Sequence, residues 1–237
     1  MAPIDRIQTD HYMIPLPRAL EDSMHGTMTG FEVVTVQVTD RDGATGVGYT
    51  FTCGVNGGAI SDILRREMTP LVLGRDAVMI EAIWKDVWWA FHYGGRGGPT
   101  VLAQSALDMA LWDLKGVKAG MPLYQLLGGY DPKVPCYAGG IDIDLTPSEL
   151  VDHTHENIAQ GHRAIKMKVG RDVLREDVAK IAAMREAFGP DLPLMVDANM
   201  KYSVDDAVRA AHAFREFDLT WFEEPIPPED PSGHRRI

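Results

Sequence analysis

The chain of 237 residues lacks several features that would assign it to a class at once. It has only two cysteines, Cys53 and Cys136, which lie far apart and at no metal-ligand spacing, so we expect free thiols in the reducing cytoplasm. No window holds about 18 uninterrupted apolar residues, so no membrane-spanning helix is expected. The first 17 residues contain no basic stretch followed by an apolar run, and we therefore expect no signal peptide.

Positive charge is also scarce, because 23 lysines and arginines stand against 34 aspartates and glutamates, a formal net charge of −11. This balance argues against nucleic acid or an anionic membrane as a partner. It leaves an anionic small molecule open, since a local group of lysines or a metal ion can reverse the field inside one pocket. The remaining composition, 45% hydrophobic and 24% charged, is that of an ordinary globular protein.

The first part of the chain has the pattern of a mixed α+β domain, over residues 1–130. Two β-rich runs within 31–51 are separated by the Asp42-Gly43 turn signal, which predicts an antiparallel hairpin. Residues 4–16 are expected to supply a third strand. Helical spacing of apolar residues recurs in three segments, 59–72, 76–91 and 100–118.

Two further segments of this first domain carry specific expectations. Residues 17–30 are flexible in composition and are expected to form a loop between two strands of the domain. Trp84, Trp88 and Trp89 lie in one helical stretch, and we expect them to pack in the domain core. The Gly- and Pro-rich segment 119–135 marks the boundary with the second part.

From about residue 134 short apolar runs alternate with helical segments. Thr146 and Ser203 are expected to cap two of these helices, since each precedes a helical pattern and an acidic residue follows Ser203 three positions later. Such alternation predicts parallel strands with right-handed crossovers, either in a barrel or in an open doubly wound sheet. No GxGxxG follows the first strand, which weakens the nucleotide-binding version. The four expected strands are 134–140, 164–170, 193–199 and 220–225.

Charged side chains lie in or at the ends of three of these strands. Lys166 and Lys168 point to the same side of one strand, because strand side chains repeat every second residue. Asp197 ends the next strand and Glu223-Glu224 the last. In a parallel barrel these strand ends share one face, where active sites lie.

This convergence predicts a specific chemistry. Neighbouring carboxylates repel unless a cation lies between them, and oxygen ligands favour a hard ion such as Mg²⁺. A lysine in a poorly solvated pocket near that ion has a lowered pKa and can act as a base. The combination suits removal of a proton next to a carboxylate. Each feature alone is more often a solvated strand face, a turn cap or a loop, but their recurrence at three successive strand ends favours the metal site.

Three segments, AIKMKVG (164–170), LMVDAN (194–199) and TWFEEP (220–225), resemble the enolase superfamily, in particular its mandelate racemase/muconate-lactonising group. The segment 106–129 resembles the helix and connector that lead into the barrel of that family. The resemblance implies an α+β capping domain at 1–130, followed by a (β/α)8 TIM-type barrel domain, of which 131–237 supplies about the first four units.

The resemblance also implies roles for individual residues. Lys168 would be the acid/base catalyst, and Lys166 would lie near the substrate carboxylate and the metal and depress the pKa of its partner. Asp197 and Glu223 would be ligands of Mg²⁺. Asn199 matches a polar position close to the substrate.

One loop residue stays ambiguous. In relatives, the loop equivalent to 17–30 folds over the barrel mouth, which would allow His25 to bind substrate. The alternative is that His25 lies in a mobile surface loop, and both interpretations stay open.

The implied activity is Mg-dependent abstraction of the proton α to a carboxylate through an enediolate, as in an acid-sugar dehydratase. The alternatives are a racemase or epimerase of a 2-hydroxy acid, or an inactive truncated fragment. A small-molecule carboxylate would be the partner, and the full-length protein would be a homo-oligomer. A complete barrel takes roughly 250 residues, so we expect the third metal ligand and the second acid/base beyond residue 237.

Overall fold

The computed structural model describes residues 2–237, which form two compact units. Unit 1 holds the described residues up to Pro17 together with Thr29–Pro132. Unit 2 holds Arg18–Met28 together with Lys133–Ile237. The predicted domain boundary after residue 130 stays a prediction.

Unit 1 contains a three-stranded sheet in the order β1-β2-β3. Its strands are β1 (Ile4–Asp22), β2 (Gly26–Asp40) and β3 (Thr45–Thr52). Strands β2 and β3 pair antiparallel with Thr39 opposite Thr45, around the turn that Asp42-Gly43 predicted. Every second residue of the central part of β2 is buried, including Val34, Val36 and Val38, as expected for a strand covered on one face.

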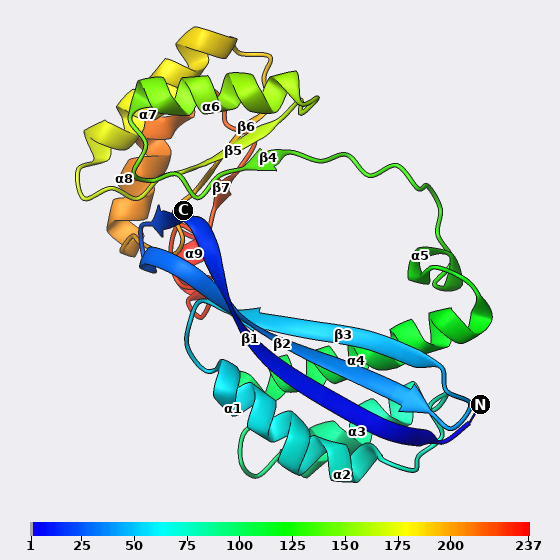
Figure 1. Cartoon of the computed structure of the whole chain (residues 1–237). Coiled ribbons are helices and arrows are strands. Elements are labelled where there is room, and N and C mark those ends of the chain that lie inside the picture. Colours follow the sequence, from blue (N-terminus) through cyan, green and yellow to red (C-terminus); the bar gives the residue numbers. More distant parts are fainter. Residues whose placement is uncertain (1) are drawn as a thin grey trace. The chain divides into compact units, whose positions relative to one another are not determined.

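Helices cover one face of this sheet (Figure 1). In chain order the helical segments of unit 1 are α1 (Gly57–Asp62), the π-helical segment η1 (Ile63–Met68), α2 (Thr69–Val72), α3 (Ile80–Ala90), α4 (Pro99–Ala119) and α5 (Leu123–Leu126), of which α5 has no buried residue. Strand β3 lies directly against α4, because a Cβ atom added at Gly48 would lie 2.0 Å from the Ala106 carbonyl oxygen. Of the helices in the described part of the chain, none has the length and apolar character needed to cross a bilayer.

Two expectations for the first part of the chain are wrong. Residues 17–30 do not form a loop, because β1 and β2 continue through this segment to a tight turn. The carboxylate of Asp22 closes that turn by accepting the backbone N–H groups of Met24 and His25, at 2.9 and 2.6 Å. Polar composition therefore marked a hydrogen-bonded hairpin tip rather than a flexible connection.

The tryptophans of α3 are not packed in the core as a group, since Trp84 and Trp89 are 42% and 51% exposed. The buried face of α3 consists of Ile80, Ile83 and Val87, which are spaced three and four residues apart. The indoles instead lie against one another, with the rings of Trp84 and Trp88 stacked 6.1 Å apart. The helical spacing of α3 therefore places the aliphatic residues, rather than the tryptophans, on the buried face.

Unit 2 contains a parallel four-stranded sheet in the order β4-β5-β6-β7, as in a partial TIM barrel. Helices α6, α7 and α8 lie on one side of it (Figure 1). Thr146 begins α6 with a reciprocal capping box to Glu149, and Ser203 accepts the backbone N–H of Asp206 at the start of α8. The elements are β4 (Ala138–Gly139), α6 (Pro147–Ala159), β5 (Ile165–Lys168), α7 (Leu174–Phe188), β6 (Leu194–Asp197), α8 (Val204–Phe214), η2 (Arg215–Phe217), β7 (Phe222–Glu223) and α9 (Pro231–His234).

The two faces of this sheet differ in character. Ile165, Met167, Leu194 and Val196 are buried in an apolar cluster with residues of the helices. Because strand side chains alternate, Lys166, Lys168 and their neighbours on β6 and β7 point to the opposite face. Hydrophobic packing on one side therefore sets the register that gathers polar groups on the other.

Candidate active site

Four of the predicted site residues meet at the carboxyl ends of β5, β6 and β7. Lys168 is in register with Asp197, and Asp197 with Glu223. The Lys168 Nζ donates to Asp197 Oδ2 at 2.7 Å. The Lys166 Nζ donates to Glu223 Oε1 at 2.7 Å and lies 3.2 Å from Asp197 Oδ2. Two ammonium groups and two carboxylates thus interlock in a cluster without formal net charge.

Burial makes these charges strongly coupled. Lys168 and Asp197 are only 7% and 2% exposed. Burial alone would raise the pKa of Asp197, but hydrogen bonds from Lys168 and from the Asn199 backbone outweigh it, so this pKa is lowered. Burial would likewise lower the pKa of Lys166, but Glu223 and Asp197 outweigh it, so this pKa is raised. The carboxylate of Asp197 and the ammonium of Lys166 are therefore both charged at neutral pH.

Sharp backbone turns follow β6 and β7 and keep the strand ends together. Asn199 and Met200 have φ angles of 46° and 66°, and Glu224 has a φ of 41°. Non-glycine residues rarely adopt this left-handed region, so the turns are held by their surroundings. The Met200 N–H donates to the Glu224 carbonyl at 2.7 Å, which continues the pairing beyond β6.

Asn199 lies at this turn, beside the charged cluster. Its backbone N–H donates to Asp197 Oδ1 at 2.9 Å. The side chain is buried, and among residues 2–237 its Oδ1 finds no hydrogen-bond partner. A buried oxygen without a donor is unfavourable, so this atom is suited to a ligand hydroxyl or a cation.

Asp142 binds the backbone of Lys168 and so supports the cluster. The sequence did not predict this residue as part of the site. It is 2% exposed, and its Oδ1 accepts the Lys168 backbone N–H at 2.8 Å. The buried Lys180 donates to the Asp142 carbonyl at 3.0 Å. Burial is the main reason that the pKa of Asp142 is raised. An acidic residue just after a short strand was the available signal, the same one that identified Asp197.

His25 lies at the tip of the β1–β2 hairpin, which belongs to unit 2. Its Nδ1 is 2.8 Å from Asp22 Oδ2. The neighbouring Ser23 donates its hydroxyl to the Ala198 carbonyl at 2.7 Å, so the hairpin tip is attached to the residue that follows Asp197. Among the interactions of the described residues, His25 binds Asp22 and not the charged cluster.

The donor atoms present suit a hard divalent cation. Among residues 2–237, no group of three or more His, Cys, Asp and Glu side chains can hold a metal ion by itself. Asp197 and Glu223, however, already share one cation, the ammonium of Lys166. The two carboxylates supply oxygen ligands of the kind that Mg²⁺ prefers, and Mg²⁺ commonly keeps several waters. The residues therefore fit Mg²⁺ if further oxygens complete its coordination.

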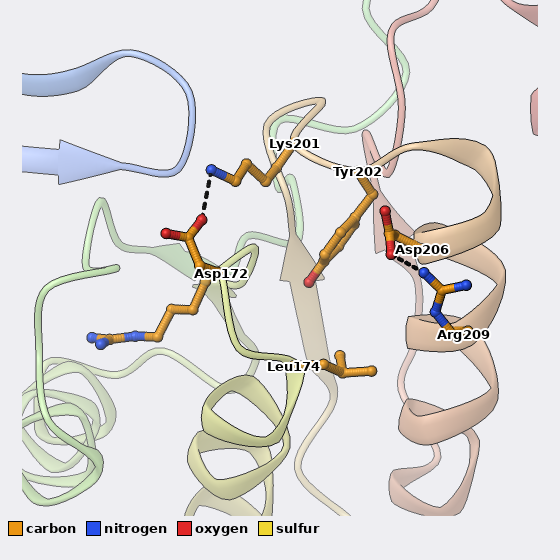
Figure 2. A pocket seen from close by; sticks show the side chains of 7 residues that line it. Asp172, Leu174, Lys201, Tyr202, Asp206 and Arg209 are labelled. Carbon is orange, nitrogen blue, oxygen red and sulfur yellow. Dashed lines mark hydrogen bonds and ion pairs between the residues drawn. The ribbon is translucent and has the colours of Figure 1, made fainter.

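A separate pocket of about 250 Å³ lies between the loops that follow β5 and β6 (Figure 2). Two ion pairs lie within its lining, since Lys201 lies 3.1 Å from Asp172 and Arg209 binds Asp206. None of the predicted site residues lines it; the lining consists of Arg171, Asp172, Leu174, Lys201, Tyr202, Asp206 and Arg209. This pocket is therefore separate from the predicted site residues.

Both parts of the chain match families of known proteins. Residues 10–128 match the N-terminal domain of mandelate racemase / muconate lactonizing enzyme. Residues 149–237 match the family described as enolase C-terminal domain-like.

Individual relatives are similar over most of this chain. It is 53% identical over 234 residues to the 3,6-anhydro-alpha-L-galactonate cycloisomerase of Streptomyces coelicolor, covering 99% of this chain and 65% of the relative. It is 35% identical to the L-talarate/galactarate dehydratase of Salmonella typhimurium, covering 89% of this chain and 53% of the relative. The chain thus spans about two thirds or less of the length of these relatives.

Solved structures agree with these matches. A racemase from Streptomyces coelicolor with bound magnesium superposes with a TM-score of 0.96 at 53% identity, covering 98% of this chain and 65% of that one. The Salmonella typhimurium L-talarate/galactarate dehydratase, liganded with Mg and L-lyxarohydroxamate, gives a TM-score of 0.92 at 31% identity, covering 98% and 61%.

Proposed function

Because the chain belongs to the mandelate racemase / muconate lactonizing enzyme family of the enolase superfamily, we propose that it serves Mg-dependent removal of the proton α to the carboxylate of an acid sugar. The observation that carries this proposal is the interlocked cluster of Lys166, Lys168, Asp197 and Glu223. It combines a buried amine with two carboxylates on adjacent strand ends.

The roles follow from the contacts. The Lys168 side chain is 9% exposed against 14% for Lys166. After its ammonium has released a proton to solvent, Lys168 would take the α-proton, while the C–H electron pair moves into the substrate carboxylate to give an enediolate. Lys166 would hold that carboxylate by charge. Asp197 and Glu223 would hold Mg²⁺, which when bound supplies positive charge where negative charge develops. Asn199 and, at the hairpin tip, His25 would bind hydroxyl groups of the substrate.

The fate of the enediolate separates two candidate reactions. Loss of a β-hydroxyl would make the protein an acid-sugar dehydratase, the reaction that the family resemblance favours and that the Salmonella relative is named for. The relative at 53% identity is named a cycloisomerase of an anhydro acid sugar, which favours a ring oxygen as the β leaving group. Return of the proton to the other face would give a racemase. All of these reactions share the first step.

Deuterium exchange tests the shared step. The protein is used at the length found in its own cells, which intact mass spectrometry gives. With Mg²⁺ in D₂O, we expect deuterium at the α-carbon of a galactonate, talarate or anhydrogalactonate, detected by NMR. Lys168→Ala should slow this exchange at least about a hundredfold, because a positioned base contributes that much. Exchange at an unchanged rate would remove Lys168 from the proposal.

Two wider proposals concern the setting of the protein. We expect a homo-oligomer, which native mass spectrometry measures directly. The two cysteines are both free and exposed, which supports a reducing compartment such as the cytoplasm.

A further inference from the structure

Two aromatic side chains lie on the same face of the unit 2 sheet as the charged cluster. Trp221 precedes β7, two residues before Glu223, so their side chains point the same way. Tyr137 precedes β4 in the same manner, and its ring centroid is 5.5 Å from that of Trp221 in an edge-to-face arrangement of 76°. The Lys166 Nζ lies 5.6 Å from the centre of the Tyr137 ring. The aromatic pair therefore borders the cluster on one side.

Trp221 also makes a polar contact with the cluster. Its indole Nε1 donates to Glu223 Oε2 at 2.9 Å, while Lys166 donates to the other oxygen, Oε1, at 2.7 Å. An indole N–H is a donor only and carries no charge. It can therefore stay bound to one carboxylate oxygen while a cation replaces the ammonium at the other.

The two carboxylates are fixed in different ways. Asp197 is short and almost fully buried, and a backbone N–H and Lys168 hold it. The side chain of Glu223 is 33% exposed and is longer, and the hydrogen bonds that the structure gives it come from side chains. Its position thus depends on Lys166 and Trp221.

We propose that Trp221 is a positioning residue that orients the Glu223 carboxylate for a divalent cation, with Tyr137 holding the indole in place. This inference rests on the proposed function, because it concerns the same cation. Partners that orient ligating carboxylates commonly change metal affinity about 10- to 100-fold.

The test removes the indole donor and keeps an aromatic ring. Trp221→Phe is expected to weaken Mg²⁺ binding about tenfold in isothermal titration calorimetry. Trp89→Phe, at an exposed tryptophan of unit 1, is the matched control and should leave the affinity unchanged. Tyr137→Leu keeps the donor and should weaken binding less; a larger loss there than in Trp221→Phe would assign the effect to packing and overturn the inference.

A second measurement follows the indole of Trp221 directly in the protein that keeps this residue, so its result does not depend on comparing the affinities of variants. With 5-fluorotryptophan incorporated, the ¹⁹F resonance absent in the Trp221→Phe spectrum belongs to this residue. We expect this resonance to shift as Mg²⁺ is added, and the dissociation constant from the shift should equal the one from calorimetry. A resonance that stays still while Mg²⁺ saturates the protein would overturn the role of Trp221. Failure of the unsubstituted protein to bind Mg²⁺ would instead overturn the proposed function.

Discussion

Replacing Lys166 by methionine should tighten the binding of Mg²⁺ even though it removes a residue of the site. In the structure the ammonium of Lys166 contacts Glu223 Oε1 at 2.7 Å and Asp197 Oδ2 at 3.2 Å. A divalent cation that uses these oxygens must first displace the ammonium. Methionine keeps the length of the side chain but offers no charge to displace.

The magnitude follows from these two contacts. A hydrogen bond to a charged group contributes about 1.5–3 kcal/mol. The Lys166 side chain is 14% exposed, so water compensates part of the loss after displacement. Taking about 2 kcal/mol as the remaining cost gives a roughly thirtyfold gain in Mg²⁺ affinity for Lys166→Met. The same variant should lose proton exchange, because the charge that holds the substrate carboxylate is gone.

Isothermal titration calorimetry at neutral pH measures the effect, with Lys201→Met as the control. That substitution makes the same change in net charge, but the partner of Lys201 is Asp172, whose side chain is 89% exposed and 3.1 Å away. A surface pair contributes about 0–1 kcal/mol, so Mg²⁺ affinity should change little. Equal or weaker Mg²⁺ binding by Lys166→Met would refute the view that the ammonium competes with the cation.

Three further predictions concern stability and the hairpin tip. Burial tends to raise the pKa of Asp40, but Lys118 and backbone N–H groups outweigh it, so this pKa is lowered. The carboxylate of Asp40 therefore stabilises the fold above the ordinary pKa of 3.8, and this stabilisation is lost as the pH falls through the lower pKa of the folded state. Asp40→Asn should cost about 2 kcal/mol in urea unfolding at neutral pH and reduce the acid dependence; an unchanged acid profile would contradict this. Gly48→Ala, whose Cβ would lie 2.0 Å from a backbone oxygen of α4, should cost about 3 kcal/mol in thermal unfolding, whereas Gly58→Ala has open space and should not destabilise; similar melting of both variants would argue against close β3–α4 packing. Ser23→Ala removes one hydrogen bond of about 1 kcal/mol, so amide exchange at the tip of the β1–β2 hairpin should accelerate roughly fivefold, and equal protection would show that the tip is held by other contacts.

Local patterns predicted the elements of unit 2 well. Thr146 and Ser203 cap helices because their side chains accept backbone N–H groups within the next turn, a contact that depends on sequence neighbours alone. The expected strands were correct in position but longer than observed, since β7 contains only Phe222–Glu223. Apolar runs mark where a strand can form, whereas its ends depend on hydrogen bonds to neighbouring strands.

The residues of the candidate site also differ in whether local sequence patterns could predict them. Lys166, Lys168, Asp197 and Glu223 could be grouped from the sequence, because the carboxyl ends of parallel strands meet at one edge. Their catalytic and metal-binding roles stay predictions. Asp142 could not be assigned to Lys168 beforehand, since its contact is with a backbone N–H 26 residues away. Such long-range contacts are fixed by packing rather than by local pattern.

The unequal anchoring of the two carboxylates determines how the site would respond to a cation. Asp197 is held by a backbone N–H and is buried, so its position is already set. Glu223 is partly exposed and held by side chains, so it can adjust when the ammonium of Lys166 leaves. The ammonium keeps the cluster neutral, because without it two carboxylates on adjacent strands would repel one another. Cation affinity would therefore be set by competition with Lys166, and the geometry of the bound cation by how firmly Trp221 holds Glu223.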